Sequence, residues 1–176
     1  KLKGHNTDGL GLLRDLTANI GVELKGKRVL LLGAGGAARG VMQPLLEQKP
    51  EKLIVSNRTK EKGVQLARDF SDLGFACGTG FDELKAKPFD VVINATSASL
   101  AGDVPPINPA VITAHTVCYD MMYSNEPTAF LTWCAEQGTT RLHDGLGMLV
   151  EQAAEAFVVW RGVRPTTAGL MTAMRD

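Results

Sequence analysis

A glycine-rich turn is the stretch of this chain best suited to binding a phosphate group. Gly33, Gly35 and Ala38 hold the spaced positions of a Gly-x-Gly-x-x-Gly/Ala pattern, directly after the apolar residues 29–32. Glycine permits a tight turn and a close backbone approach to a pyrophosphate, and the small third residue lets a helix pack on its strand. The free N–H groups of that helix then face the phosphates. The pattern predicts a dinucleotide site; an ordinary strand-to-helix turn is the alternative.

The residues after the next apolar run would determine which dinucleotide binds. A site for NAD places an acid about 20 residues after the glycines, where it binds the ribose hydroxyls. Here residues 53–56 lead into Asn57, Arg58 and Thr59 without an acid, and Lys62 follows one helical turn later. A guanidinium is a planar, permanently charged partner for phosphate. These residues predict a site for the 2′-phosphate of NADP. The alternative is that Arg58 is an ordinary solvated loop residue.

Apolar runs and helical periodicities alternate along the chain and would position these turns. We expect strands at 29–32, 53–56, 75–77, 89–94, 116–120 and 140–142, helices at 10–20, 36–48, 60–70, 127–137 and 146–160, and a last helix from Pro165. Pro44 lies inside the second helix and predicts a kink or an early end. The alternation predicts an α/β fold: a Rossmann-like doubly wound, mainly parallel sheet with helices on both faces.

Composition excludes several classes of partner. The 176 residues carry no net charge and 44% are hydrophobic, which suits a globular domain and gives no argument for nucleic acid or a membrane surface. No apolar run reaches the roughly 18 residues of a membrane span. The cysteines lack CxxC spacing and indicate reduced thiols of a cytoplasmic protein: Cys77, Cys118 and Cys134. The histidines lack metal-ligand spacing, so we expect no metal site: His5, His115 and His143.

Five segments in the same order resemble the shikimate dehydrogenase family: GHNTDG (4–9), GAGGAAR, NRT, NATS and DGLGMLVEQAAEAF. These NADPH-linked enzymes reduce 3-dehydroshikimate to shikimate in aromatic amino acid biosynthesis. The resemblance implies two domains, of which the N-terminal one binds substrate and carries a catalytic lysine. It implies that residues 1–176 are the NADP-binding domain, with the helices in 1–24 and about 146–176 at the junction with a missing substrate domain. No lysine of this chain matches the catalytic one.

The resemblance also assigns the cofactor-binding residues. They form a phosphate loop, a clamp for the adenosine phosphate and a nicotinamide border: Gly33, Ala34, Gly35, Gly36, Ala37, Ala38, Asn57, Arg58, Thr59, Lys62, Thr96, Met121 and Gly145. The chain departs from the family pattern at Lys62, where arginine is frequent, and at 98–100, where a residue followed by glycine is usual. Core packing is the alternative for Met121.

The substrate residues that the resemblance implies are Asp8, Tyr123 and Gln152, with Asp8 also catalytic. Hydride addition to a carbonyl creates an alkoxide, which needs a proton donor and fixed polar groups. A lysine tuned by the Asp8 carboxylate could donate that proton. Helix capping by Asn6, Thr7 or Asp8, and plain surface exposure of Gln152, are the alternatives.

The expected function is therefore an NADP(H)-binding domain that lacks full activity by itself. Two alternatives remain: a quinate/shikimate dehydrogenase paralogue that uses NAD, and a non-catalytic nucleotide-binding module. Acceptance of quinate and the oligomeric state are left open by the sequence.

Overall fold

The computed structural model describes residues 2–175, without the side chain of Leu100. Six strands among these residues form one sheet in the order β3-β2-β1-β4-β5-β6, with every pair parallel. The strands are β1 (Arg28–Leu32), β2 (Lys52–Asn57), β3 (Ala76–Gly80), β4 (Val91–Asn94), β5 (Val117–Asp120) and β6 (Leu142–His143). This confirms the expected doubly wound fold. The chain winds outward from β1 in both directions, which places a crevice at the carboxyl ends of β1 and β4.

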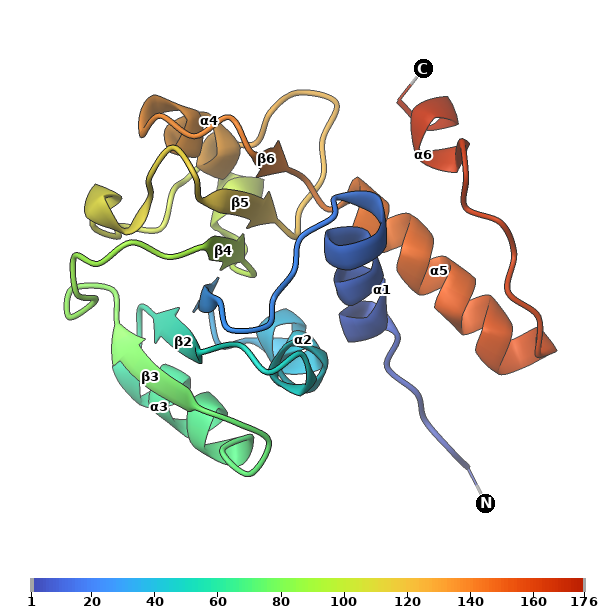
Figure 1. Cartoon of the computed structure of the whole chain (residues 1–176), viewed down its shortest axis with the longest axis horizontal. Coiled ribbons are helices and arrows are strands. Elements are labelled where there is room, and N and C mark those ends of the chain that lie inside the picture. The colour runs from blue at the N-terminus through green and yellow to red at the C-terminus, as the bar shows by residue number, and fades with distance from the viewer. Residues whose placement is uncertain (1, 176) are drawn as a thin grey trace.

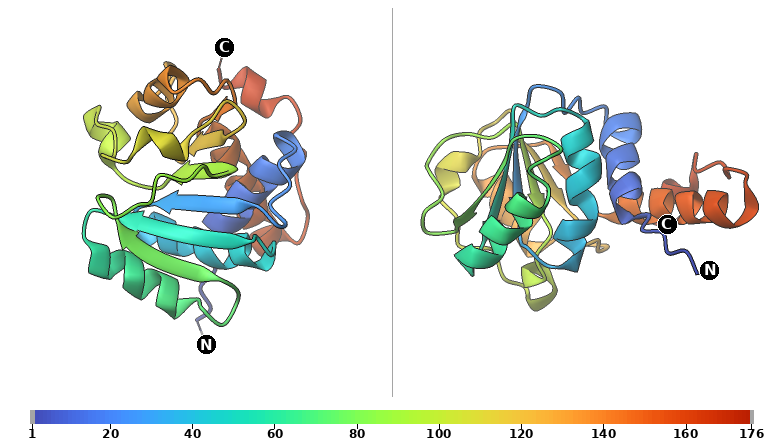
Figure 2. Two further views of the ribbon diagram at one scale, coloured as in Figure 1. Left: turned by 60° about the vertical axis from the view of Figure 1, so that its left-hand side comes forward. Right: turned by 90° about the horizontal axis from the view of Figure 1, so that it is seen from below.

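Helices cover both faces of the sheet (Figure 1). They are α1 (Asp8–Arg14), which continues as the π-helical turn η1 (Asp15–Asn19), α2 (Gly36–Glu47), α3 (Lys60–Asp69), α4 (Ala129–Glu136), α5 (Leu146–Arg161) and α6 (Leu170–Ala173). Two 3-10 turns, η2 (Ala98–Ala101) and η3 (Pro109–Val111), lie in the connections around β4 and β5. The first three helices lie over one face and α4 over the other, while α5 runs outward beside α1 (Figure 2).

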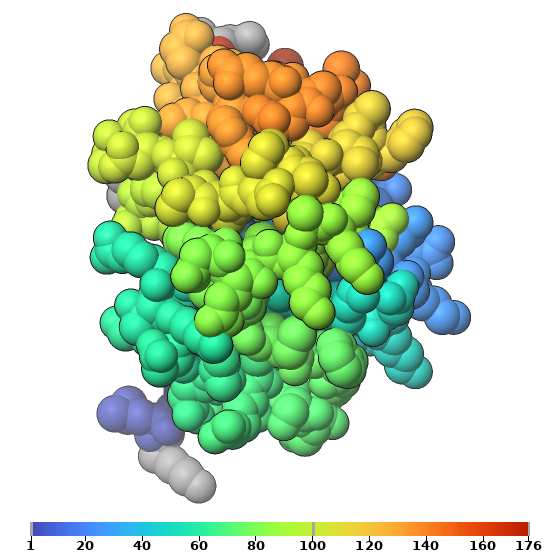
Figure 3. Space-filling view, turned by 90° about the vertical axis from the view of Figure 1, so that its left-hand side faces the viewer, coloured from blue at the N-terminus to red at the C-terminus, as the bar shows by residue number. Residues whose placement is uncertain are grey.

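Alternate residues of the central strand enter two separate cores. Val29 and Leu31 pack with α1, α2 and α3, whereas Leu30 and Leu32 pack with α4 and the connections around it. All four are buried, as a parallel sheet covered on both faces requires. The sheet thus supports the turns at its carboxyl edge rigidly. Figure 3 shows one face of the molecule, with α3 and β3 toward one end and α4 toward the other.

Pro44 does not end α2 early, contrary to one of the two outcomes expected for it, since the helix continues to Glu47. Proline has no N–H, so the carbonyl of Gly40 lacks its helical partner. Helix α1 passes over this place at Gly9, where an added Cβ would collide with the Gly40 carbonyl and with the Pro44 ring. The proline therefore lies at a close helix crossing.

The last helix does not begin at Pro165 as expected; α6 begins at Leu170. Side chains on both sides of Pro165 bind α5. Arg164 pairs with Glu151 and Glu155, and the Thr167 hydroxyl donates to Glu151 Oε1 at 2.8 Å. These side-chain contacts hold the segment in a non-helical conformation.

Strand β3 extends to Gly80, beyond the expected 75–77. Gly78 and Gly80 supply no apolar side chain, so the sequence pattern did not mark them. At Gly78 an added Cβ would collide with the backbone of Gly63 and Val64 in α3. Glycine is therefore required here by helix-on-sheet packing.

Candidate functional site

A cavity of about 790 Å³ lies along the carboxyl ends of β1, β2 and β4. Its volume is in the range of cofactor sites, about 300–1,000 Å³. Four separate segments line it: Gly33, Ala34, Gly35, Gly36, Ala37, Asn57, Arg58, Thr59, Lys62, Phe81, Ala95, Thr96, Ser97, Ala98, Ala101, Asp103, Val104, Pro105 and Pro106. The structure thus brings together the glycine turn, the Asn57–Arg58–Thr59 segment and Thr96, as the sequence predicted.

The glycine turn presents bare backbone to this cavity. Gly33 has φ +103°, and its N–H donates to Ser56 O at 2.8 Å. An added Cβ there would lie 3.0 Å from Ala95 O, so the turn also packs tightly on the loop after β4. At Gly35 and Gly36 an added Cβ would meet nothing within 4 Å. A ligand can therefore approach the backbone closely at the N-terminus of α2, and a helix N-terminus is suited to an anion.

Two cations without ion-pair partners lie at one end of the cavity. Among the described residues, neither Arg58 nor Lys62 forms an ion pair. The turn between β2 and α3 is shaped by Asn57, whose amide donates to Thr59 O at 2.8 Å. Asp103 is the carboxylate in the cavity lining. This end can bind a dianionic phosphate through charge-assisted hydrogen bonds.

Arg39, unlike Arg58 and Lys62, already has an ion-pair partner. It pairs with Asp69, and its guanidinium carbon lies 5.7 Å from the centroid of the Phe70 ring, within the distance of about 6 Å that is typical of a cation–π contact. Its hydrogen bond lowers the pKa of the Asp69 carboxyl. Arg39 thus fastens α2 to α3 and leaves phosphate binding to other residues.

The edge beyond β4 carries the residues expected near the nicotinamide. Asn94 Oδ1 accepts hydrogen bonds from Thr96 N at 3.1 Å and from Thr96 Oγ1 at 2.7 Å. Met121 is half-buried against the core, and an added Cβ at Gly145 would collide with its carbonyl. Met121 and Gly145 are therefore neighbours, although neither lines the cavity.

Sheet order fixes the sequence of these groups along the edge. Arg58 follows β2, the glycine turn follows β1, Thr96 follows β4 and Met121 follows β5. A dinucleotide with its pyrophosphate at the glycine turn would extend one nucleoside toward Arg58 and the other toward Thr96 and Met121. Ala38 belongs to neither end, because its side chain is fully buried in the core beneath α2.

Asp8, Gln152 and Tyr123 lie outside the cavity. Helix α1 begins at Asp8, and its first N–H is bound by Asn6 Oδ1 at 2.8 Å, so Asp8 is not the cap. Gly11, one turn later, lies so close to α5 that an added Cβ would be 2.6 Å from Gln152 Cβ. Asp8 and Gln152 therefore stand on adjoining helices, while the Tyr123 side chain is half-exposed.

Phe81 and residues 103–106 also line the cavity, and the sequence did not assign them. Phe81 directly follows β3, so its position after a strand was the available signal. The proline-rich segment showed only that a loop was expected. Its place in the lining of the same cavity as the glycine turn depends on the tertiary fold.

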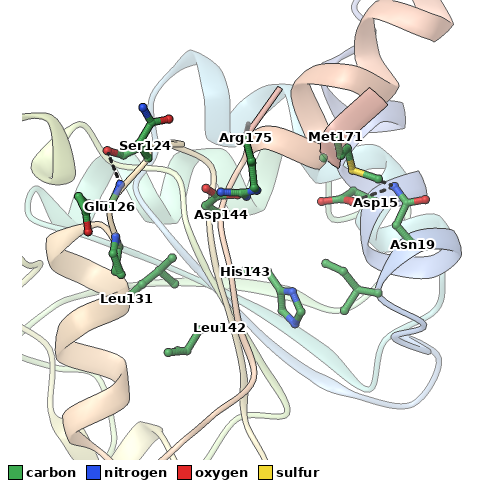
Figure 4. A pocket seen from close by; sticks show the side chains of 14 residues that line it. Asp15, Asn19, Ser124, Glu126, Leu131, Leu142, His143, Asp144, Met171 and Arg175 are labelled. Carbon is green, nitrogen blue, oxygen red and sulfur yellow. Dashed lines mark hydrogen bonds and ion pairs between the residues drawn. The ribbon is translucent and has the colours of Figure 1, made fainter. Parts of the chain in front are cut away.

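A second cavity of about 620 Å³ lies beyond the edge strand β6 (Figure 4). There Arg175 reaches Asp144, and Asn19 lies between Asp15 and Met171. Burial and the nearby Asp15 carboxylate raise the pKa of Tyr119, whose hydroxyl donates to Asp15 at 2.7 Å. None of the predicted site residues lines this cavity. The described residues contain no cluster of three metal-type side chains and no helix long and apolar enough to cross a membrane.

Comparisons with known proteins agree with this geometry. The family model "Shikimate / quinate 5-dehydrogenase" matches residues 15–101, and "Shikimate 5'-dehydrogenase C-terminal domain" matches residues 145–175. A shikimate dehydrogenase (NADP(+)) of Hahella chejuensis is 55% identical over 176 residues, which are 100% of this chain and 65% of that protein.

Solved structures give the same picture. An Ael1 enzyme from Pseudomonas putida superposes with a TM-score of 0.88 at 45% identity, over 96% of this chain and 62% of that one. Shikimate 5-dehydrogenase from Thermus thermophilus in complex with NADP(H) and shikimate gives 0.81 at 33% identity, over 98% and 62%. The chain spans less than two thirds of the length of these relatives. It belongs to the shikimate dehydrogenase family.

Proposed function

We propose that this chain is the NADP-binding part of an enzyme that reversibly reduces 3-dehydroshikimate to shikimate in aromatic amino acid biosynthesis. The observation that carries the proposal is one cavity lined both by a glycine turn and by Arg58 and Lys62, two cations that form no ion pair with the other described residues. A relative of this chain is named shikimate dehydrogenase (NADP(+)). In keeping with the biosynthetic activity of such relatives, we also propose that the chain is cytoplasmic.

The residues of this chain suit both the pyrophosphate and the 2′-phosphate of NADP. The N-terminus of α2 and the bare backbone at Gly35 and Gly36 suit the pyrophosphate. Arg58, with Lys62 and the polar groups of Asn57 and Thr59, suits the 2′-phosphate. When bound, the reduced cofactor supplies a hydride to the substrate carbonyl. Thr96, Met121 and Gly145 would border the ring that carries it.

Asp8 is proposed as the catalytic carboxylate. Its side chain accepts no hydrogen bond from the other described residues, so it is free to bind a substrate hydroxyl or a lysine. Gln152 on the adjoining helix and Tyr123 would complete this chain's contacts with substrate. The proton for the developing alkoxide would come from the lysine that the resemblance places in the substrate domain.

We further propose that residues 1–176 form the cofactor domain, with 1–24 and about 146–176 at the junction with the substrate domain. Large apolar side chains exposed on α1 and on the outer part of α5 and its continuation support this arrangement: Leu10, Phe157, Val159, Trp160 and Val163. On this view the 176-residue chain binds NADP without turning over substrate.

Calorimetric titration of the chain with NADP and with NAD tests the cofactor assignment. We expect clearly tighter binding of NADP. Equal affinities would favour a paralogue that uses NAD, and absence of binding to both would reject the nucleotide site. Reduction of NADP by the chain alone in the presence of shikimate would contradict the division of the active site between two domains.

A further inference from the structure

A buried carboxylate lies where β4 and β5 end. Asp120 is fully buried and accepts four hydrogen bonds. Ser99 Oγ and Thr128 Oγ1 each donate to Oδ2 at 2.6 Å, while Asn94 Nδ2 at 3.2 Å and Met122 N at 3.1 Å donate to Oδ1. All four donors are neutral, and among the described residues no cation pairs with this carboxylate.

The four donors come from four separate segments. Asn94 ends β4, Ser99 lies in the loop after it, Met122 follows β5, and Thr128 caps α4. Burying a carboxylate is costly unless its hydrogen bonds are made. Because a fully satisfied buried network is rigid, Asp120 fixes these segments relative to one another.

Ser99 connects this network to the cavity. Its hydroxyl donates to Asp120 and accepts from Asn94 Nδ2 at 3.2 Å. The residues on both sides of it in the loop line the cavity, among them Thr96, Ala98 and Ala101. A change at Ser99 would therefore free the loop on the cavity wall without removing a residue from that wall.

Position along the sheet limits the reach of this network. Asp120 belongs to β5, and Arg58 follows β2, with β1 and β4 between these two strands. The glycine turn after β1 separates the two ends of the cavity. The network therefore acts on the Thr96 and Met121 end and leaves the Arg58 end alone.

We propose that Asp120 and Ser99 are positioning residues that hold the 95–101 loop and Met121 against the nicotinamide half of the dinucleotide. The proposal rests on the assignment of NADP as the cofactor. It predicts that the two halves of the ligand respond differently to the same substitution, which a purely structural role would not produce.

The test compares two ligands by calorimetry on the 176-residue chain. NADP carries both halves, and 2′,5′-ADP carries the adenosine half with the 2′-phosphate. In Ser99→Ala we expect affinity for NADP to fall about 3- to 10-fold, on the scale of one hydrogen bond, and affinity for 2′,5′-ADP to stay constant. Ser99→Thr keeps the hydroxyl and should restore binding of NADP.

Equal losses for both ligands, or no loss for either, would overturn the proposal. Asp120→Asn is the second variant and should give the same split with a larger loss for NADP, provided that its melting curve shows a folded chain; Ser99→Ala decides the matter if it does not. The unsubstituted chain tests the cofactor assignment separately. If it binds 5′-AMP as tightly as 2′,5′-ADP, the assignment of NADP fails, whatever the variants do.

Discussion

The carboxyl edge of the sheet and the α1–α5 pair hold their polar residues in different ways. At the sheet edge, residues far apart in sequence surround one cavity of about 790 Å³. Asp8 and Gln152 lie on adjoining helices, and neither they nor the half-exposed Tyr123 line the cavities of about 620 and 790 Å³. The first group forms a concave site from this chain's own residues, whereas the second lines neither of these cavities.

The difference follows from how each group is positioned. The residues of the cavity lie in the turns after strands, in the first turns of the helices that follow, and in the connection after β4. Parallel pairing brings these strand ends to one edge. Asp8 and Gln152 are placed by a close helix contact at Gly11. If our proposal is correct, substitutions on the two sides should separate cofactor binding from turnover.

The largest expected effect is that of Asp8→Asn on turnover. In a full-length enzyme containing this chain, we expect kcat to fall by about 10²- to 10⁴-fold, the scale of general acid–base catalysis. Affinity for NADP should not change, because Asp8 is outside the cavity. Steady-state kinetics and a cofactor titration measure the two effects. Unimpaired turnover would remove Asp8 from the mechanism.

Arg58→Ala should affect cofactor binding at the carboxyl edge of the sheet. We expect NADP to bind more weakly by about 1.5–3 kcal/mol, the value of a hydrogen bond to a charged group, and NAD to bind almost as before. Arg39→Ala is the matched control, since that guanidinium is occupied by Asp69. Equal losses for NADP and NAD would refute a role for Arg58 at the 2′-phosphate.

Gly11→Ala should separate the two helices without touching the cavity. The added methyl group would meet the Cβ and the backbone N of Gln152, at 2.6 and 2.7 Å, so we expect a loss of about 1–3 kcal/mol in the free energy of unfolding. Urea denaturation measures it. Gly4→Ala is the control, because an added Cβ there meets nothing within 4 Å. A loss of NADP affinity in folded Gly11→Ala would show that the two sides are coupled.

The smallest expected effect is a pH dependence from His143. Burial lowers the pKa of His143, helped by Arg141 and opposed by Asp15 and Asp144. The unfolded chain therefore takes up a proton before the folded chain does, and stability falls as the pH drops below the unfolded value of about 6.5. His143→Gln should reduce the fall in Tm between about pH 7 and about pH 5. The same change at the exposed His115 is the control, and an identical response of both variants would contradict the assignment.

Sequence patterns predicted the features that depend on local chemistry. The glycine turn, the absence of an acid before Arg58 and the alternation of strands and helices each follow from residues close together in the chain. The structure confirms the fold and brings the turn and Arg58 into one cavity.

Features that depend on distant partners were missed. The non-helical segment around Pro165 is held to α5 by Arg164 and Thr167, and β3 contains glycine where α3 packs closely on it. Asp120 showed nothing unusual in sequence, since its donors come from four segments. Such contacts have no period or spacing that a single sequence reveals.

The π-helical turn at Asp15–Asn19 sets a limit on insertions and deletions. A π turn holds one residue more than an α-helical turn, and here the N–H of Ile20 reaches back to the Asp15 carbonyl at 2.9 Å. Removing one residue would let the helix close into regular α geometry. Removing one residue between Asp8 and Gly11 would instead rotate Asp8 by about 100° around the helix axis, away from the face that packs against Gln152. The number of residues between Asp8 and Gly11 is therefore part of the design of the site, although neither of these two residues lies in the cavity.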